Sequence, residues 1–231
     1  MRPHRAELLH RLETVAVALG EDLARVVFVG GAVVALYDWT VDEDVRTTKD
    51  IDCMVDVTWL EYQALQHRLC ARGFGYTMEA KAPACRLRLG ADVLVDVMPI
   101  DGTILGFSNP WYREAAAYAE TYALPNGQEV RAVSPLYFSA TKLDAFKDRG
   151  FADMLSSHDL EDVVSVLSSS ETLRDTVSVD PRPVCSFIRS VLLEASQQGE
   201  FFDALEGHFR GDPSGQKAYQ AFAAWVRQLH R

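Results

Sequence analysis

Three aspartates are the residues whose type and spacing point most directly to chemistry. Asp50 and Asp52 flank Ile51 at the start of an apolar run, and Asp96 lies in the middle of another apolar run, residues 93–99. Side chains two residues apart on a strand project from the same face, so Asp50 and Asp52 point the same way. Neighbouring carboxylates repel unless a cation lies between them, and a lone carboxylate within an apolar strand is costly.

These aspartates predict a metal site if the two strands are neighbours. Mg²⁺ or Mn²⁺ is the expected occupant, because a hard cation takes carboxylate oxygens and leaves room for substrate phosphates. Three carboxylates on adjacent strands suit a two-metal site for in-line phosphoryl chemistry. The alternative is that the Asp50–Asp52 pair merely caps a turn, since the D-x-D pattern is common by chance.

Other acidic residues nearby are weaker candidates for the site. Asp101 is an alternative third ligand, but it lies in the polar turn Ile-Asp-Gly, whereas the neighbours of Asp96 are apolar. Asp56 and Asp92 are expected to be solvated groups at strand ends. Asp96 is therefore the preferred third carboxylate.

A glycine pair precedes the aspartates and adds a phosphate-binding feature. Gly30-Gly31 lies between an expected strand, 26–30, and an expected helix, 32–39. Such a junction lets the backbone approach a phosphate, with free amides at the helix start. An ordinary strand-to-helix turn is the alternative for the pair taken alone.

Further elements must position these residues. Hydrophobic periodicity predicts helices at 5–19 and 59–74, a strand at 51–57, two strands joined at Gly90 within 84–100, and a hairpin over 121–134. From Ser134 onward the pattern becomes helical, with expected helices at 135–149, 158–167, 182–196, 200–209 and 218–230. The fold class expected is α/β (α+β): a mixed sheet flanked by helices in residues 1–133, then a helical domain in residues 134–231.

Composition limits the classes of function. The chain has 231 residues, and its formal net charge of −10 disfavours non-specific binding of long nucleic acid, although a short end needs only a local groove. The four cysteines form no C-x-x-C pair, which argues against a zinc knuckle or redox pair and predicts reduced thiols. No apolar stretch is long enough for a transmembrane helix and no secretory signal is recognisable, so a cytoplasmic protein without a membrane partner is expected.

The order of these motifs resembles the nucleotidyltransferase superfamily related to DNA polymerase β. The detail is similar to its AbiEii-type branch, the abortive-infection and toxin nucleotidyltransferases. The resemblance covers roughly residues 26 to 166, and its motifs are Arg46-Thr47-Thr48-Lys49-Asp50-Ile51-Asp52, then Lys142-Leu143-Asp144-Ala145-Phe146, Arg149-Gly150 with Asp153, and residues 157–164. Two features depart from the pattern of polymerase-β relatives: Gly-Gly replaces Gly-Ser, and the acidic insert 39–46 lengthens the gap before Asp50 and is expected to alter access to the site.

The resemblance implies a role for each matching residue. Asp50 and Asp52 would hold the metals, and Asp96 would bind one metal and act as a base or position the attacking group. Lys142 would be a point charge on the triphosphate, the alternative being a surface lysine on an amphipathic helix. The nucleotide-binding residues would be Gly30, Gly31, Arg46, Lys49, Lys142 and Asp159, although Asp159 also suits a first-turn position that complements the helix dipole.

The implied activity is Mg²⁺-dependent transfer of a nucleoside monophosphate from a nucleoside triphosphate such as ATP to an acceptor hydroxyl. The acceptor suggested by the toxin-like resemblance is an RNA 3′ end, transfer RNA included, in a toxin–antitoxin or phage-defence setting with a cognate antitoxin as partner. Alternatives are a small molecule or a protein hydroxyl as acceptor, or a non-catalytic module that senses nucleotides or binds a partner. Arg86 and Arg88, which share one strand face, would line an RNA groove, or would belong to a solvated sheet face.

Overall fold

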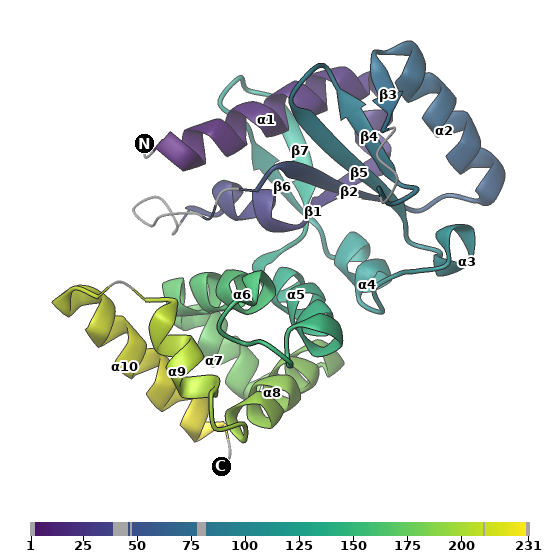
Figure 1. The fold of residues 1–231 in the computed structure, drawn as a ribbon. Helices are drawn as coiled ribbons and strands as arrows, with labels where there is room; N and C mark the ends of the chain where they lie inside the picture. Colours follow the sequence, from purple (N-terminus) through teal and green to yellow (C-terminus); the bar gives the residue numbers. More distant parts are fainter. Residues whose placement is uncertain (1–2, 39–45, 47, 78–81, 210, 230–231) are drawn as a thin grey trace. The chain divides into compact units, whose positions relative to one another are not determined.

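The computed structural model describes residues 3–38, 46, 48–77, 82–209 and 211–229. The chain forms two compact units, Met1–Ser134 and Pro135–Arg231. The first contains the sheet and the second is helical (Figure 1). Most of the acidic insert expected to alter access to the site, residues 39–45, lies outside the described residues, as does Thr47.

Seven strands of the first unit form one mixed sheet in the order β3-β4-β5-β2-β1-β7-β6. At its centre β2 (Asp50–Val55) runs antiparallel to β1 (Val26–Val29) and parallel to β5 (Val93–Pro99). The outer strands are β3 (Phe74–Tyr76), β4 (Arg86–Leu89), β6 (Glu120–Ala123) and β7 (Glu129–Ala132). The mixed sheet flanked by helices confirms the expected α/β fold class.

Helices of the first unit are anchored to the sheet and to the chain around it. In α1 (Pro3–Leu19), Arg5 Nε donates to the carbonyl of Ala35, 2.8 Å away. In α2 (Trp59–Ala71), the buried Tyr62 hydroxyl donates to the carbonyl of Val97 in β5 at 2.8 Å. The short elements are the 3₁₀ helices η1 (Gly20–Arg25) and η2 (Gly31–Leu36) and the helices α3 (Gly102–Leu105) and α4 (Tyr112–Ala117).

The second unit consists of helices among its described residues. They are α5 (Pro135–Arg149), α6 (His158–Ser169), α7 (Glu171–Val179), α8 (Pro183–Ser196), α9 (Phe201–Gly207) and α10 (Pro213–Gln228). Apolar faces of α6 and α8 supply much of the core, with Val163, Leu167 and Ile188 completely buried. Figure 1 shows these helices in green to yellow.

Several element boundaries differ from the sequence prediction. The helix expected at 32–39 is the 3₁₀ helix η2, which ends at Leu36. The helix expected at 59–74 ends at Ala71, because Gly73 adopts a positive φ of 96° and Phe74 begins β3. The strands joined near Gly90 and the hairpin over 121–134 are present as β4–β5 and β6–β7. All four cysteines are free, and no helix in the described ranges is long and apolar enough to cross a membrane.

Candidate metal centre

The sheet register brings the three aspartates together. Asp52 in β2 lies directly beside Asp96 in the parallel neighbour β5, and Asp50 lies two residues before Asp52 on the same face. One carboxylate oxygen from each lies within 4.8 Å of the other two. Asp96 is buried, whereas Asp50 and Asp52 are partly exposed. The expected convergence of the aspartate triad (Asp50, Asp52 and Asp96) is therefore present in the structure.

An arginine on the next strand contacts two members of the triad. Arg86 in β4 lies opposite Asp96 in the antiparallel register, so both side chains leave the same face of the sheet. Its Nε donates to Asp96 Oδ1 at 2.8 Å, and its Nη2 donates to Asp96 Oδ2 at 2.6 Å and to Asp50 Oδ2 at 2.9 Å. The fork-like contact with Asp96, and secondarily the surrounding negative charge, raises the pKa of Arg86.

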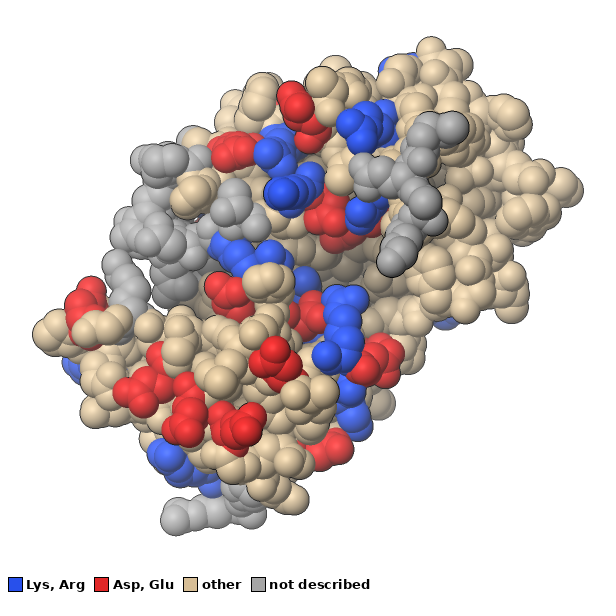
Figure 2. Space-filling view, in the orientation of Figure 1, with Lys and Arg blue, Asp and Glu red and all other residues tan. Residues whose placement is uncertain are grey.

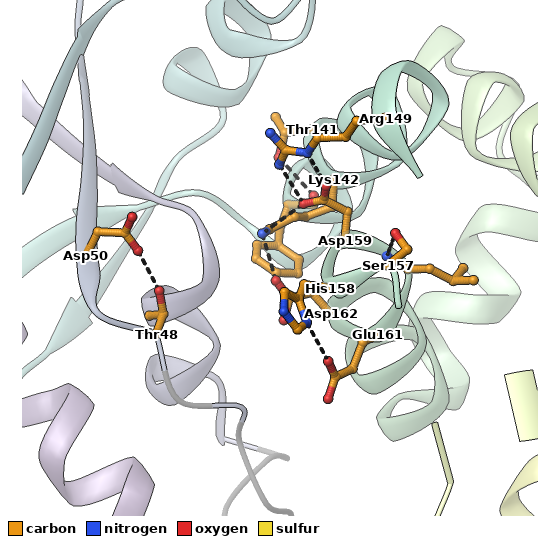
Figure 3. Close-up of polar contacts among 12 residues, drawn as sticks. Thr48, Asp50, Thr141, Lys142, Arg149, Ser157, His158, Asp159, Glu161 and Asp162 are labelled. Carbon is orange, nitrogen blue, oxygen red and sulfur yellow. Dashed lines mark hydrogen bonds and ion pairs between the residues drawn. The ribbon is translucent and has the colours of Figure 1, made fainter. Parts of the chain in front are cut away.

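The chain just before β2 holds Asp50 from the other side. The buried hydroxyl of Thr48 donates to Asp50 Oδ1 at 2.7 Å (Figure 3). Arg11 in α1 in turn donates to the carbonyls of Thr48 and Lys49, at 3.1 and 3.3 Å. Both oxygens of Asp50 thus have a donor, which fixes the orientation of its carboxylate.

Gly30 leaves the space that Asp52 occupies. Its φ of 76° and ψ of −174° lie in a region that side chains with a Cβ rarely adopt. A Cβ at this position would collide with Oδ2 of Asp52 and would lie 2.7 Å from its Cγ. Glycine is therefore required here for close approach of the backbone to a triad carboxylate, and Gly31 follows as the first residue of η2.

The donor set of the triad fits a hard divalent cation. Asp50 and Asp96 carry two negative charges, whereas Arg86 brings one positive charge to this pair. Each carboxylate oxygen has two lone pairs, so the hydrogen bonds from Thr48 and Arg86 leave acceptor capacity for a metal. Oxygen-only ligands and partial exposure favour Mg²⁺ or Mn²⁺ over a softer metal.

Two buried thiols lie near the triad, Cys53 within β2 and Cys85 directly before β4, and the protonated form of both is favoured. Burial, and then the negative charges of Asp52 and Asp96, raises the pKa of Cys53 well above its ordinary value. Burial, and then the charge of Asp96, raises the pKa of Cys85 to about 12. A protonated thiol is a poor metal ligand, so the carboxylates are the ligands available on these strands.

The weaker acidic candidates have other surroundings. Asp101 is the N-cap of α3 and accepts hydrogen bonds from the backbone and hydroxyl of Thr103, at 2.9 and 2.7 Å. Asp56 is exposed and lies 3.7 Å from Arg113, and Asp92 is exposed in the turn after β4. Both strand-end residues are thus as solvated as expected, and Asp101 is engaged in capping.

The two basic residues predicted to bind nucleotide near the triad are in the segment before β2. Arg46 is partly exposed, and Lys49 is exposed immediately before Asp50. Arg88 donates to the carbonyl of Ala91 at 3.3 Å in the β4–β5 turn. Arg86, in contrast, contacts the triad itself: its guanidinium is engaged by Asp50 and Asp96, so it does not belong to a merely solvated sheet face, and its place in an RNA groove stays a prediction.

Lys142 and Asp159, predicted from the helical motifs, lie in the second unit and contact each other. Lys142 Nζ lies 2.7 Å from Asp162 Oδ2 and 3.3 Å from Asp159 Oδ1, and its side chain is 14% exposed. Arg149 donates to both oxygens of Asp159 at 2.8 and 3.1 Å. These four residues form the α5–α6 ion-pair cluster (Figure 3), so Lys142 is not a solvated surface lysine.

Electrostatics within the α5–α6 ion-pair cluster favour the ionised form of Asp159. Burial raises the pKa of Asp159, but the hydrogen bond from Arg149 and the charge of Lys142 outweigh burial and hold that pKa below the ordinary value of 3.8. Gly150 packs tightly in the same region, where a Cβ would collide with Phe146 and lie 2.6 Å from the Ser157 hydroxyl. These ion pairs and this tight packing give the residues of the helical motif a structural role.

Comparison with known proteins finds distant structural likenesses, among them two that cover most of this chain. No protein-family model matches the chain, and no curated protein matches it in sequence. The antibiotic-resistance factor ANT(2'')-Ia is 15% identical, with 83% of this chain and 94% of that chain covered and a TM-score of 0.49. JHP933 from Helicobacter pylori is 11% identical, with 97% of this chain and 92% of that chain covered and a TM-score of 0.43. Likeness at this level does not assign a function, which has to come from the residues of the site.

Proposed function

We propose that this chain is a divalent-cation-dependent nucleotidyltransferase of the polymerase-β-like superfamily. It would transfer a nucleoside monophosphate from a nucleoside triphosphate to an acceptor hydroxyl, with pyrophosphate leaving. The observation that carries the proposal is the convergence of Asp50, Asp52 and Asp96, whose ligand oxygens lie within 4.8 Å of one another on adjacent strands. Their sequence order after Gly30-Gly31 resembles that superfamily, and the AbiEii-type branch is the specific assignment we propose.

The triad residues would perform separate tasks. Asp50 and Asp52 would hold the cations, and a bound Mg²⁺ would neutralise phosphate charge and orient the reacting groups for in-line displacement. Asp96, oriented by Arg86, would bind one cation and accept the proton of the acceptor hydroxyl or position that hydroxyl. The main contribution of the protein would be positioning and charge stabilisation.

Nucleotide contacts are proposed from the resemblance. Gly30 and Gly31 would contact the triphosphate through the backbone, which at Gly30 already passes close to Asp52. Arg46 and Lys49 would add positive charge from the segment before β2. Lys142 would be a point charge on the triphosphate, and Asp159 would orient Lys142 through their 3.3 Å ion pair.

The acceptor we propose is an RNA 3′ end, with transfer RNA ends first, as the toxin-like resemblance suggests. Figure 2 shows acidic and basic side chains interspersed among the coloured residues of each unit. Together with the net charge of −10, this favours a short single-stranded end over a long duplex. A small molecule or a protein hydroxyl is the alternative acceptor, and a toxin–antitoxin setting with a cognate antitoxin is part of the same proposal.

A labelling experiment tests the activity and the acceptor together. The protein is incubated with Mg²⁺, each α-labelled nucleoside triphosphate in turn and a total cell extract, and RNA, protein and small molecules are then separated. We expect labelled RNA. In Asp52→Asn the amount of label should fall at least about a hundredfold, since loss of a carboxylate that holds the metal costs several kcal/mol in the transition state. The exposed Asp56→Asn is the matched control and should label normally.

The distribution of label decides between the alternatives. Label in protein or small molecules alone would refute the RNA acceptor and leave nucleotidyl transfer in place. Label that persists in Asp52→Asn would refute the triad as the catalytic site. Nucleotide binding without transfer to any fraction would favour the non-catalytic sensing module.

A further inference from the structure

Arg86 lies where a cation shared by two triad aspartates would lie. A single nitrogen, Nη2, contacts Asp50 Oδ2 at 2.9 Å and Asp96 Oδ2 at 2.6 Å. A Mg²⁺ ion that ligated the same two oxygens would need to approach each to about 2.1 Å. Two positive groups cannot occupy this position together, so the guanidinium and the metal compete for it.

The contacts of Arg86 differ in how they would respond to a metal. Its Nε donates to Oδ1 of Asp96 at 2.8 Å, which is not the oxygen that Nη2 contacts, and this hydrogen bond does not involve Asp50. The guanidinium can therefore leave Asp50 and stay attached to Asp96 through Nε. Thr48 contacts the other oxygen of Asp50, Oδ1, at 2.7 Å, so this hydrogen bond can keep Asp50 oriented while Oδ2 is released.

We infer that Arg86 is a resident counter-ion of the aspartate triad, which holds Asp50 and Asp96 together without metal and is displaced from Asp50 Oδ2 when a divalent cation binds. The inference rests on the proposed function only in requiring that the triad binds a divalent cation. Arg86 acts through the two carboxylates, so it is a positioning residue. It lowers the affinity of the site for a free metal ion and stabilises the carboxylates in its absence.

Replacing Arg86 by an uncharged residue of similar length should have two consequences, one for stability and one for metal affinity. Without the guanidinium, Asp50 and Asp96 repel each other, so the metal-free protein should be less stable. The metal no longer has to displace a positive group, and like charges a few ångströms apart repel strongly, so metal affinity should rise. If Arg86 had only a structural role, its substitution would lower stability without raising metal affinity.

The experiment measures Mn²⁺ binding by isothermal titration calorimetry, with no nucleotide present. Wild type is compared with Arg86→Met and with the matched control Arg88→Met, which lies two residues along the same strand, opposite Leu94. We expect Arg86→Met to bind Mn²⁺ at least about tenfold more tightly than wild type. Its melting temperature should fall without metal and recover with saturating Mn²⁺, and Arg88→Met should match the wild-type affinity.

The remaining outcomes overturn the inference in distinguishable ways. If the wild type binds Mn²⁺ and Arg86→Met binds it equally or more weakly, the counter-ion role is overturned and the proposed function stands. No Mn²⁺ binding by any of the proteins overturns the inference together with the metal dependence of the proposed function. If Arg86→Met does not fold at any Mn²⁺ concentration, Arg86→Gln decides, because its amide keeps a hydrogen-bond donor for the carboxylates but carries no positive charge. Tighter binding by Arg86→Gln than by wild type supports the inference, and unchanged or weaker binding overturns it.

Discussion

The aspartate triad and the α5–α6 ion-pair cluster both bury carboxylates beside cations, but they differ in charge balance. Asp159 and Asp162 have two cations in contact, Lys142 and Arg149. In the described part of the chain, Asp50 and Asp96 are bridged by one guanidinium, that of Arg86. The cluster is therefore balanced, with two carboxylates and two cations in contact, whereas the Asp50–Asp96 pair has one cation between two carboxylates. On this contrast we propose the triad as the metal site and expect the cluster to stabilise the packing of α5 on α6.

Removing a cation from the balanced cluster should have the largest effect on stability. Lys142→Met leaves the buried Asp162 without the ammonium that lies 2.7 Å from it, and breaking a buried ion pair costs about 3 kcal/mol. Chemical denaturation should therefore show a loss of that size. Lys147→Met is the control, since Lys147 is exposed and pairs with the exposed Glu194, and it should change stability by less than about 1 kcal/mol.

The affinity of Lys142→Met for nucleotide tests whether this residue has a second role. If Lys142 also binds the triphosphate, Lys142→Met should reduce affinity for the nucleotide beyond what the loss of folded protein explains. Equal nucleotide affinity of the folded variant and the wild type would restrict Lys142 to its structural role. A stability loss no larger than that of Lys147→Met would contradict the account of the cluster.

A Cβ at Gly30 should harm the triad and the fold together. Gly30→Ala imposes backbone strain and a collision with Asp52, and we expect a loss of about 2 kcal/mol in the free energy of unfolding. The matched control is Gly106→Ala, where φ is 79° but no atom lies within 4 Å of the added Cβ. Only Gly30→Ala should also weaken Mn²⁺ binding; equal Mn²⁺ affinity in both variants would show that Gly30 does not shape the site.

The smallest effect is expected at Asp101, the alternative third carboxylate. Asp101→Ala removes the N-cap of α3 and should lower stability only slightly, because α3 is short and its residues are at least partly exposed. Because its carboxylate accepts hydrogen bonds from Thr103, metal binding should be unchanged. A clear loss of Mn²⁺ affinity in Asp101→Ala would instead place this residue among the ligands and weaken the assignment of Asp96.

Local sequence patterns were sufficient to predict the two strands that carry the aspartate triad. Alternation places Asp50 and Asp52 on one face, and the cost of a carboxylate within an apolar strand singles out Asp96. For Lys142 the pattern left open a surface lysine on an amphipathic helix, and the structure instead places it largely buried on α5. The partners of these groups were harder to predict, because ion pairs such as Lys142 with Asp162 join residues 20 positions apart in sequence.

Arg86 shows how strand register limits such prediction. A hairpin centred on Gly90 would place Arg86 opposite Leu94, whereas the observed register is centred on Ala91 and places it opposite Asp96. Both registers keep Arg86 on the same face, so alternation alone cannot separate them. Short elements were missed for a related reason: β3 has three residues and α3 has four, too few for a periodic signal.

The most direct test of the triad as a metal site is the thermal stability of wild type and Asp50→Asn/Asp52→Asn, each with and without Mg²⁺ and a nucleoside triphosphate. A ligand that binds only the folded state raises the melting temperature, so we expect Mg²⁺ with nucleotide to raise it in the wild type. The double variant should stay folded and lose this shift, whereas the exposed pair Asp56→Asn/Asp92→Asn should keep it. A metal-dependent shift that persists in Asp50→Asn/Asp52→Asn would contradict the account and place the metal elsewhere.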